Sequence, residues 1–248
     1  MSRYFLEVSY KGTNYSGFQI QQNANSIQAE IEKAIQILQK EKIGLTGSSR
    51  TDAGVHALQN FFHFDFEGKI SPQFIYRMNA ILPGDIVVQK IMAVQQESHC
   101  RFDAISREYK YFIYWHKNPF LKDRAFYFPY KLNMELMQQA AALIKGYKDF
   151  TSFSKRNTQV KTFNCCIMES TWERENECLV FYVKADRFLR GMVRALVANM
   201  LKIGRGKMTI TAFKQVIEAK DCTKTTFAAP SYGLFLMRVN YKGKQFEC

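Results

Sequence analysis

The spacing of hydrophobic and polar positions over the first hundred residues predicts a regular order of elements. In chain order these are a strand at 3–10, a helix at 27–38, strands at 43–46 and 59–66, a helix at 72–82 and a strand at 86–94. Asn25 or Ser26 would cap the first helix, and Ser71 with Pro72 would open the second. The order β-α-β-β-α-β is the ferredoxin-like pattern.

The second half of the chain repeats this order with longer connections. Its predicted elements are a strand at 107–114, a helix at 133–145, a hairpin of strands at 163–172 and 179–185, helices at 189–203 and 211–219, and a strand at 233–241. No sequence repeat accompanies the repeated order. We therefore predict an α+β fold with two ferredoxin-like halves, residues 1–103 and 104–248. The halves are expected to join into a larger mixed sheet with helices on one side and a basic cleft on the other.

The charge of the chain predicts a polyanionic partner. The 248 residues include 35 Lys and Arg against 22 Asp and Glu, a formal net charge of +13. An excess of this size favours binding to nucleic acid or to an anionic membrane surface. The alternative is a basic enzyme with no such partner. A hydrophobic content of 47% excludes intrinsic disorder as the state of the whole chain.

Segments that would indicate a membrane, an export signal or a metal are weak or missing in the sequence. No apolar run approaches the roughly 18 residues of a membrane span, and we predict no signal peptide because a strand begins almost at once. The six Cys form no C-x-x-C pair and the four His are scattered, so we expect reduced thiols in the cytoplasm and no metal.

The polar segment 47–57 is the first candidate for chemistry. It lies between two predicted strands and places a guanidinium, a hydroxyl and a carboxylate side by side in Arg50, Thr51 and Asp52. Scaffolds commonly present functional side chains on such loops. The alternative is a long structural turn in which Asp52 makes an Asx-type bond and Gly54 supplies a positive φ.

Three arginines form the second candidate. Arg187, Arg190 and Arg194 have the spacing i, i+3, i+7, which would place them on one helix face. That face becomes apolar further along, so we expect Arg194 to be partly buried and to need an anionic partner. The alternatives are a structural ion pair or a stem that extends to water.

The strand 107–114 is the third candidate because of its aromatic residues. Tyr109 shares one face of this strand with Tyr111 and Ile113. An aromatic ring beside a cleft can stack on an unpaired base, although most strand tyrosines are core or edge residues. The composition alone does not single out Tyr109.

Several motifs together resemble the tRNA pseudouridine synthase A family over nearly the whole chain. The most specific is SRTDAGVHA at 49–57, and supporting segments are YKGTNYSGFQ at 10–19, NAILPGDI at 79–86, HCRFDA at 99–104 and APSYGL at 229–234, with Phe188-Leu189 and Met192-Val193-Arg194. Two positions depart from the family pattern. Phe18 stands where Trp is usual, and Lys11 stands where Asp is common.

The resemblance implies roles for individual residues. Asp52 would be the catalytic carboxylate, Tyr109 the ring against the target uracil, and Arg194 the ion-pair partner of Asp52. Arg50 would fill the space that the flipped base leaves. Thr51, His56 and Leu189 would also contact the substrate.

The resemblance further implies an isomerase that converts uridine to pseudouridine in the anticodon arm of tRNA, at positions 38 to 40. Such an enzyme would need no cofactor and no metal, would act in the cytoplasm and would work as a homodimer. The alternatives are a catalytically silent RNA-binding protein on the same fold and a synthase that acts on another RNA such as rRNA. An enzyme of small metabolites is a weaker alternative, because it leaves the positive charge unexplained.

Overall fold

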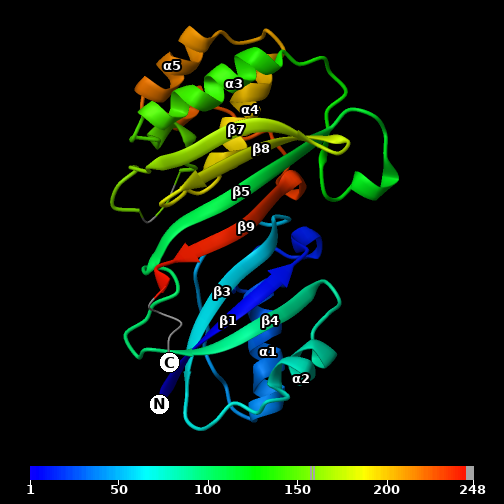
Figure 1. The fold of residues 1–248 in the computed structure, drawn as a ribbon, viewed down its shortest axis with the longest axis vertical. Helices are drawn as coiled ribbons and strands as arrows, with labels where there is room; N and C mark the ends of the chain where they lie inside the picture. Colours follow the sequence, from blue (N-terminus) through cyan, green and yellow to red (C-terminus); the bar gives the residue numbers. More distant parts are fainter. Residues whose placement is uncertain (157, 159, 244–248) are drawn as a thin grey trace. The chain divides into compact units, whose positions relative to one another are not determined.

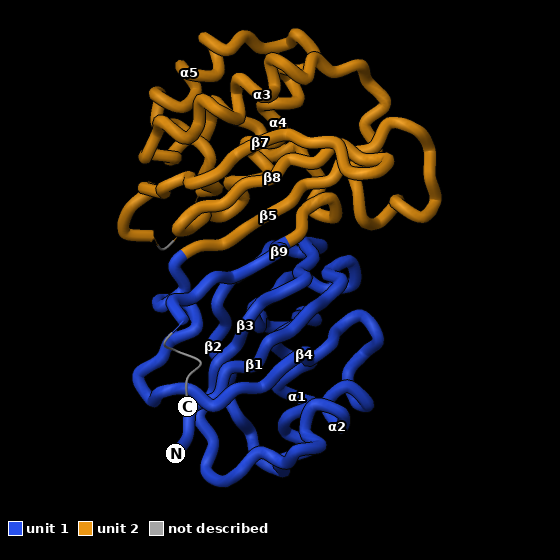
Figure 2. The backbone as a smooth tube through the Cα atoms, in the orientation of Figure 1, with its two compact units in different colours: residues 1–105, 236–248 blue, residues 106–235 orange. Residues whose placement is uncertain are grey.

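The computed structural model of the chain describes residues 1–243 except 157 and 159. The chain forms two compact units, coloured separately in Figure 2. Unit 1 consists of Met1–Ile105 and Leu236–Cys248, and unit 2 is Ser106–Phe235. The last strand therefore contributes mainly to the first unit, whereas the sequence placed the whole of 104–248 in the second half.

Unit 1 contains the predicted β-α-β-β-α-β order. Its elements are β1 (Ser2–Tyr10), α1 (Ile27–Gln39), β2 (Thr46–Gly47), β3 (His56–Phe66), α2 (Phe74–Ile81) and β4 (Ile86–Val94), followed much later by β9 (Leu234–Tyr241). The strand order is β4-β1-β3-β9, and β2 pairs with β3 (Figure 1). β1 is antiparallel to both neighbours, with Leu6 opposite Phe62 on β3 and Ile91 on β4.

The helices of unit 1 follow from their caps and apolar spacing. Ser26 accepts a hydrogen bond from the N–H of Ala29, as an N-cap should, and Ile27, Ile31 and Ile35 are buried. α2 begins two residues later than predicted. Ser71 Oγ accepts from the N–H of Gln73 in a local turn, and the helix starts only at Phe74.

The strand predicted at 43–46 is almost absent. Only Thr46 and Gly47 pair with β3, opposite His63 and Phe62. Ile43 and Leu45 are buried without joining the ladder. Burial of alternating apolar residues is therefore not sufficient evidence for a strand here, because the side chains can pack while the backbone bonds elsewhere. The N–H of Leu45, for example, donates to Glu32.

Unit 2 is a smaller sheet covered by three helices. Its elements are β5 (Ala104–Tyr114), β6 (Phe126–Tyr127), α3 (Met134–Leu143), β7 (Ile167–Glu175), β8 (Cys178–Ala185), α4 (Met192–Gly204) and α5 (Ile210–Glu218). The strand order is β5-β8-β7, antiparallel throughout, with β6 parallel to β5. The helices α3, α4 and α5 lie together over one face of this sheet (Figure 1). The predicted α+β class is confirmed.

The start of α4 corrects one prediction. The helix begins at Met192, so Arg187 and Arg190 precede it and do not share a helix face with Arg194. Gly191 has φ 76°, a left-handed conformation that other residues adopt only at a cost, and this ends the irregular segment before the helix. Among the residues that the structure describes, none of the helices has the length and apolar character needed to cross a bilayer.

Candidate functional site

The loop that carries Asp52 lies in unit 1, between β2 and β3. The N–H of Val55 donates to the carbonyl of Asp52 at 3.2 Å, and Gly54 has φ 77°. The positive φ at Gly54, which the sequence analysis gave as part of the structural alternative for this segment, is present. Asp52 itself is half-buried, between a buried Thr51 and an exposed Ala53. The turn therefore presents this carboxylate at the surface of unit 1.

A buried polar network holds the loop from beneath. The hydroxyl of Tyr10, at the end of β1, lies 2.8 Å from Thr51 Oγ1. The side-chain amide of Asn60, on β3, donates to Tyr10 Oη at 3.1 Å and to the carbonyl of Ser49 at 2.8 Å. Asn60 is fully buried, and buried polar groups that are satisfied in this way fix a single local geometry. Two strands thus set the position of the residues on both sides of Arg50.

A second loop, after β1, packs against the Asp52 loop. The N–H of Gly12 donates to His56 Nδ1 at 3.1 Å, and the N–H of Phe18 donates to the carbonyl of Thr51 at 3.1 Å. A Cβ at position 12 would lie 2.0 Å from the carbonyl oxygen of Val55, so only glycine allows this approach. Phe18, one of the two departures from the family pattern, is a core residue stacked on Phe62 with ring centroids 4.4 Å apart.

These contacts separate the predicted substrate-binding residues of unit 1 into two groups. Arg50 is exposed, and its Nη1 donates to Gln19 Oε1 at 3.2 Å. Thr51 and His56 are buried and their polar atoms bond within the protein. In this arrangement Thr51 and His56 hold the loop, and direct substrate contact by either residue stays a prediction.

Tyr109 and Leu189 belong to unit 2. Tyr109 lies on β5 opposite Val183 of β8, and is 9% exposed. Its ring meets the edge of Phe188 at a centroid distance of 4.9 Å and an interplanar angle of 81°. Leu189, the next residue, is buried in the turn before α4. Phe188 therefore packs against the Tyr109 ring, a contact that the sequence did not reveal.

Arg194 is half-buried in the first turn of α4, as its sequence context predicted. Its Nε donates to the carbonyl of Ala229 at 2.7 Å, and one terminal nitrogen donates to the carbonyl of Phe227 at 3.3 Å. Backbone carbonyls of the segment before β9 thus orient one side of the guanidinium fork. The predicted pairing of Arg194 with Asp52 joins residues of different units and stays a prediction.

Sequence reasoning missed the residues that hold the site in place. Asn60 and Tyr10 belong to strands that the sequence predicted well, but nothing in an alternating pattern distinguishes a buried asparagine that supports a loop. The carbonyls of Phe227 and Ala229 are backbone groups, so no side-chain motif could indicate them. A polar residue at a buried strand position is the only signal that was available, and Asn60 has it.

One group of potential metal ligands occurs among the described residues. His63, His99 and Cys100 have ligand atoms within 4.8 Å of one another. The thiol of Cys100 donates to the carbonyl of Thr46 at 3.1 Å, and His63 Nδ1 lies 3.2 Å from the sulfur. His99 Nδ1 accepts from the N–H groups of Arg101 and Phe102, at 3.2 and 3.4 Å. Hydrogen bonds within the protein already use these atoms, and they hold the turn 99–103 in place.

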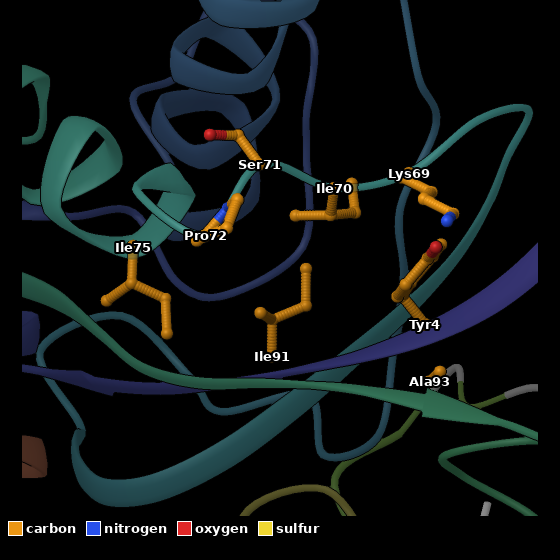
Figure 3. A pocket seen from close by; sticks show the side chains of 8 residues that line it. All are labelled: Tyr4, Lys69, Ile70, Ser71, Pro72, Ile75, Ile91 and Ala93. Carbon is orange, nitrogen blue, oxygen red and sulfur yellow. The ribbon is translucent and has the colours of Figure 1, made fainter.

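A pocket elsewhere in unit 1 contains none of the predicted site residues. It has a volume of about 360 Å³ and lies between β4 and the segment leading into α2, as Figure 3 shows. Ile70, Ile75 and Ile91 face one another across it, with Tyr4 and Lys69 at one end. Its lining offers no carboxylate or imidazole, so we do not place the chemistry there.

The comparison with known proteins identifies the family. The sequence pattern of the family described as tRNA pseudouridine synthase matches residues 7–103 and 140–242. The chain is 45% identical over 248 residues to tRNA pseudouridine synthase A of Parabacteroides distasonis, covering 99% of this chain and 98% of the relative. It is 42% identical to the protein of that name from Porphyromonas gingivalis, covering 99% of this chain and 100% of the relative. The chain therefore belongs to the tRNA pseudouridine synthase family.

Proposed function

We propose that this protein isomerises uridine to pseudouridine in tRNA, with Asp52 as the essential carboxylate. The observation that carries the proposal is the loop of Asp52, which a buried network fixes in a chain of this family. The reaction breaks the C1′–N1 bond and makes a C1′–C5 bond. Because there is no net oxidation or reduction, the chemistry requires no redox cofactor.

An ionised carboxylate suits this reaction. Asp52 can bond to C1′ or C6 of the substrate, or stabilise positive charge that develops at C1′ when the glycosidic bond breaks. Its position on a turn with a fixed backbone keeps the group aimed without reorganisation during the reaction. Small neighbours, Ala53 and Gly54, leave space for a nucleotide.

Three further residues are assigned roles by the resemblance. Arg194 pairs with Asp52 and orients its carboxylate, since the planar fork of a guanidinium suits two hydrogen bonds to a carboxylate. Tyr109 stacks on the uracil after the glycosidic bond breaks and assists in removing the C5 proton. Arg50 occupies the space that the base leaves, because the target must leave its stack before the carboxylate can reach it. The exposed guanidinium of Arg50 suits this role.

The finer features of the proposal also come from the resemblance. The substrate is the anticodon arm of tRNA, at positions 38 to 40, and the active form is a homodimer in the cytoplasm. The net charge of +13 supports a phosphate-binding surface, and RNA binding should then weaken steeply as salt is raised.

The test is pseudouridine mapping of total RNA from cells that lack the protein, with and without the gene restored. We expect pseudouridine to be lost at positions 38 to 40 of tRNA and regained on restoration. Loss at sites in rRNA instead would overturn the assigned substrate. An unchanged map, combined with tight RNA binding by the purified protein, would indicate a silent RNA-binding protein.

A further inference from the structure

Phe102 occupies an unusual position in unit 1. Its side chain is 74% exposed, at the end of the turn that links β4 to β5. Single exposed apolar residues are common and carry no message by themselves. Phe120, in unit 2, is equally exposed at 77%. What distinguishes Phe102 is its support and its surroundings.

The turn that carries Phe102 is held by several hydrogen bonds. Within it, the N–H of His99 donates to Asp103 Oδ2 at 2.7 Å and the N–H of Asp103 donates to the carbonyl of His99 at 3.0 Å. From outside it, Tyr241 Oη donates to the carbonyl of Cys100 at 2.6 Å. Buried Cys100 also donates to Thr46, as described above. An aromatic ring is thus held in water on a backbone that has little freedom left to lose on binding.

The ring of Phe102 contacts two other planar side chains, those of His99 and Arg101. The imidazole of His99 lies 4.2 Å from it, centroid to centroid, at an angle of 35°. The guanidinium carbon of Arg101 lies 5.6 Å from the centre of the ring. Burial lowers the pKa of His99, so its imidazole is neutral at physiological pH and the positive charge at this place comes from Arg101.

Phe102 also lines a pocket. The pocket has a volume of about 200 Å³, and Phe18, Gly47 and Arg50 lie along it together with His99 and Arg101. Arg50 and Gln19, bonded to each other, give it a polar rim. Ligand pockets are usually larger, about 300–1,000 Å³, so this one suits a single flat ring system.

We propose that this pocket binds an unpaired nucleobase of the RNA substrate, stacked on Phe102 with its phosphate near Arg101. An aromatic face, an adjacent guanidinium and a small pocket are the features with which proteins bind unstacked bases. The inference deepens the proposed function and rests on an RNA substrate. Asp52 does not line this pocket, so the base held here is a neighbour of the isomerised one.

The first experiment measures the affinity of the full-length protein for a tRNA transcript. Loss of a base–aromatic stack costs about 1–3 kcal/mol, so Phe102→Ala should weaken binding by about 5- to 150-fold. Phe102→Trp and Phe102→Tyr should stay within about threefold of the wild type, whereas Phe102→Leu should behave like Phe102→Ala. Phe120→Ala is the matched control and should change binding by less than about twofold.

The salt dependence of RNA binding distinguishes the stacking contribution of Phe102 from the charge contribution of Arg101. Phe102→Ala should leave the slope of log affinity against log salt unchanged, because a stack displaces no counterions. Arg101→Gln should reduce that slope by about one unit. Since Phe102 is exposed, the melting temperature of Phe102→Ala should be close to that of the wild type. Phe102→Leu and Phe102→Trp are both apolar, so a difference in their RNA affinity reports the aromatic ring and not apolar character.

A second experiment identifies the base. Each unpaired nucleotide of the transcript is replaced in turn by an abasic one, and affinity is measured with the wild type and with Phe102→Ala. At the stacked position the abasic change should weaken wild-type binding but alter binding to Phe102→Ala by less than about twofold, as a double-mutant cycle requires for one shared contact.

Three results would overturn the inference. The first is an RNA affinity of Phe102→Ala equal to that of the wild type, and the second is equal RNA affinity in Phe102→Leu and Phe102→Trp. The third is a change in the oligomeric mass of Phe102→Ala at unchanged RNA affinity, which would assign Phe102 to a contact between copies of the chain. Pseudouridine formation is measured in parallel. If the wild type binds through Phe102 but forms no pseudouridine, the proposed function fails and the base pocket stands.

Discussion

Units 1 and 2 present their candidate residues in different ways. In unit 1 Asp52 and Arg50 lie on an irregular loop whose backbone is held by side chains from two strands. In unit 2 Tyr109 lies on the long strand β5 and Arg194 in the first turn of α4, each placed by regular hydrogen bonding. The loop therefore depends on a few buried polar groups, whereas the unit 2 residues depend on elements that the whole hydrophobic core stabilises.

This difference predicts where each unit is vulnerable. A change beneath the Asp52 loop should lower activity by more than it lowers stability, because only the loop loses its support. A change in unit 2 should affect the reaction only when it removes the functional side chain itself. The following variants test this contrast.

The largest effect is expected for Asp52→Asn. The amide keeps the size of the side chain but removes its charge and nucleophilicity, so single-turnover pseudouridine formation should fall by at least about 10³-fold. RNA affinity should stay within about threefold of the wild type. Glu41→Gln, at an exposed carboxylate of unit 1, is the control and should be fully active. An active Asp52→Asn protein would remove this residue from the chemistry.

Arg194→Lys should reduce the rate by about 10²-fold. Lysine retains the charge but cannot reproduce the fork, which bonds the carbonyls of Ala229 and Phe227 and, in the proposed pairing, the carboxylate of Asp52. The measurement is the single-turnover rate at saturating protein, with Arg174→Lys on β7 as control. A rate for Arg194→Lys near that of the wild type would contradict the assigned role.

The buried imidazole of His63, on β3, predicts a loss of stability in acid. Burial, followed by the charges of His99 and Arg3, lowers the pKa of His63 to about 4 from an ordinary 6.5. Between pH 6.5 and about 4, His63 is therefore protonated in the unfolded chain but still neutral in the folded chain. Stability from this group is complete above pH 6.5 and is lost as pH falls through about 4, by at most about 3 kcal/mol.

Chemical denaturation from pH 7 to pH 4 measures this effect. His63→Gln should be less sensitive to pH than the wild type over this window, because other titrating groups contribute equally to both proteins. Parallel curves for the two proteins would show that the protonation of His63 does not differ between the folded and unfolded states.

Asn60→Ala tests the network beneath the loop. It leaves the buried carbonyl of Ser49 without its donor, which should cost about 2 kcal/mol of stability. The control is Asn79→Ala, which removes a pair of side-chain bonds to Val88 on β4 at a more exposed position away from the loop. Both variants should be destabilised, but only Asn60→Ala should also lose catalytic rate. Equal rates in the two would show that the loop does not need this support.

The smallest effect is expected for Tyr10→Phe. The change removes one hydroxyl that contacts Thr51 and Asn60, at a cost of about 1 kcal/mol in unfolding free energy. Tyr4→Phe is the control, because the Tyr4 hydroxyl makes a long exposed bond to Gly68 at 3.3 Å. Tyr4→Phe should be unchanged in stability, and an equal loss in both variants would contradict a special role for Tyr10.

Much of the fold could be predicted because the pattern and the caps agreed. α1 has a Ser26 cap and three isoleucines at helical spacing, and both features were correct. The predictions that were wrong lie where tertiary contacts decide. β2 is short because the backbone near Leu45 bonds to Glu32, and α4 starts late because of the left-handed Gly191. The bond to Glu32 has no local signature in the sequence, whereas Gly191 was a local signal that the helix predicted at 189–203 did not take into account.

The site was predictable in part for a similar reason. The Asp52 loop is continuous in sequence, so its residue types could be read together as one motif. Tyr109 is an isolated residue in an ordinary strand, and the resemblance alone singled it out. Arg194 was already a candidate because of the apolar residues that follow it in the predicted helix. The supporting groups, Asn60 and Phe188, act through packing and hydrogen bonds between distant segments, and such contacts become visible only in three dimensions.

Tritium release from a tRNA transcript that carries tritium at C5 of uridine tests the central claim most directly. The isomerisation removes the C5 proton, so the purified wild-type protein, without added cofactor, should release tritium in proportion to the pseudouridine formed. Asp52→Asn should bind the same transcript and release none. Tight binding of the transcript by the wild-type protein without tritium release would contradict the account.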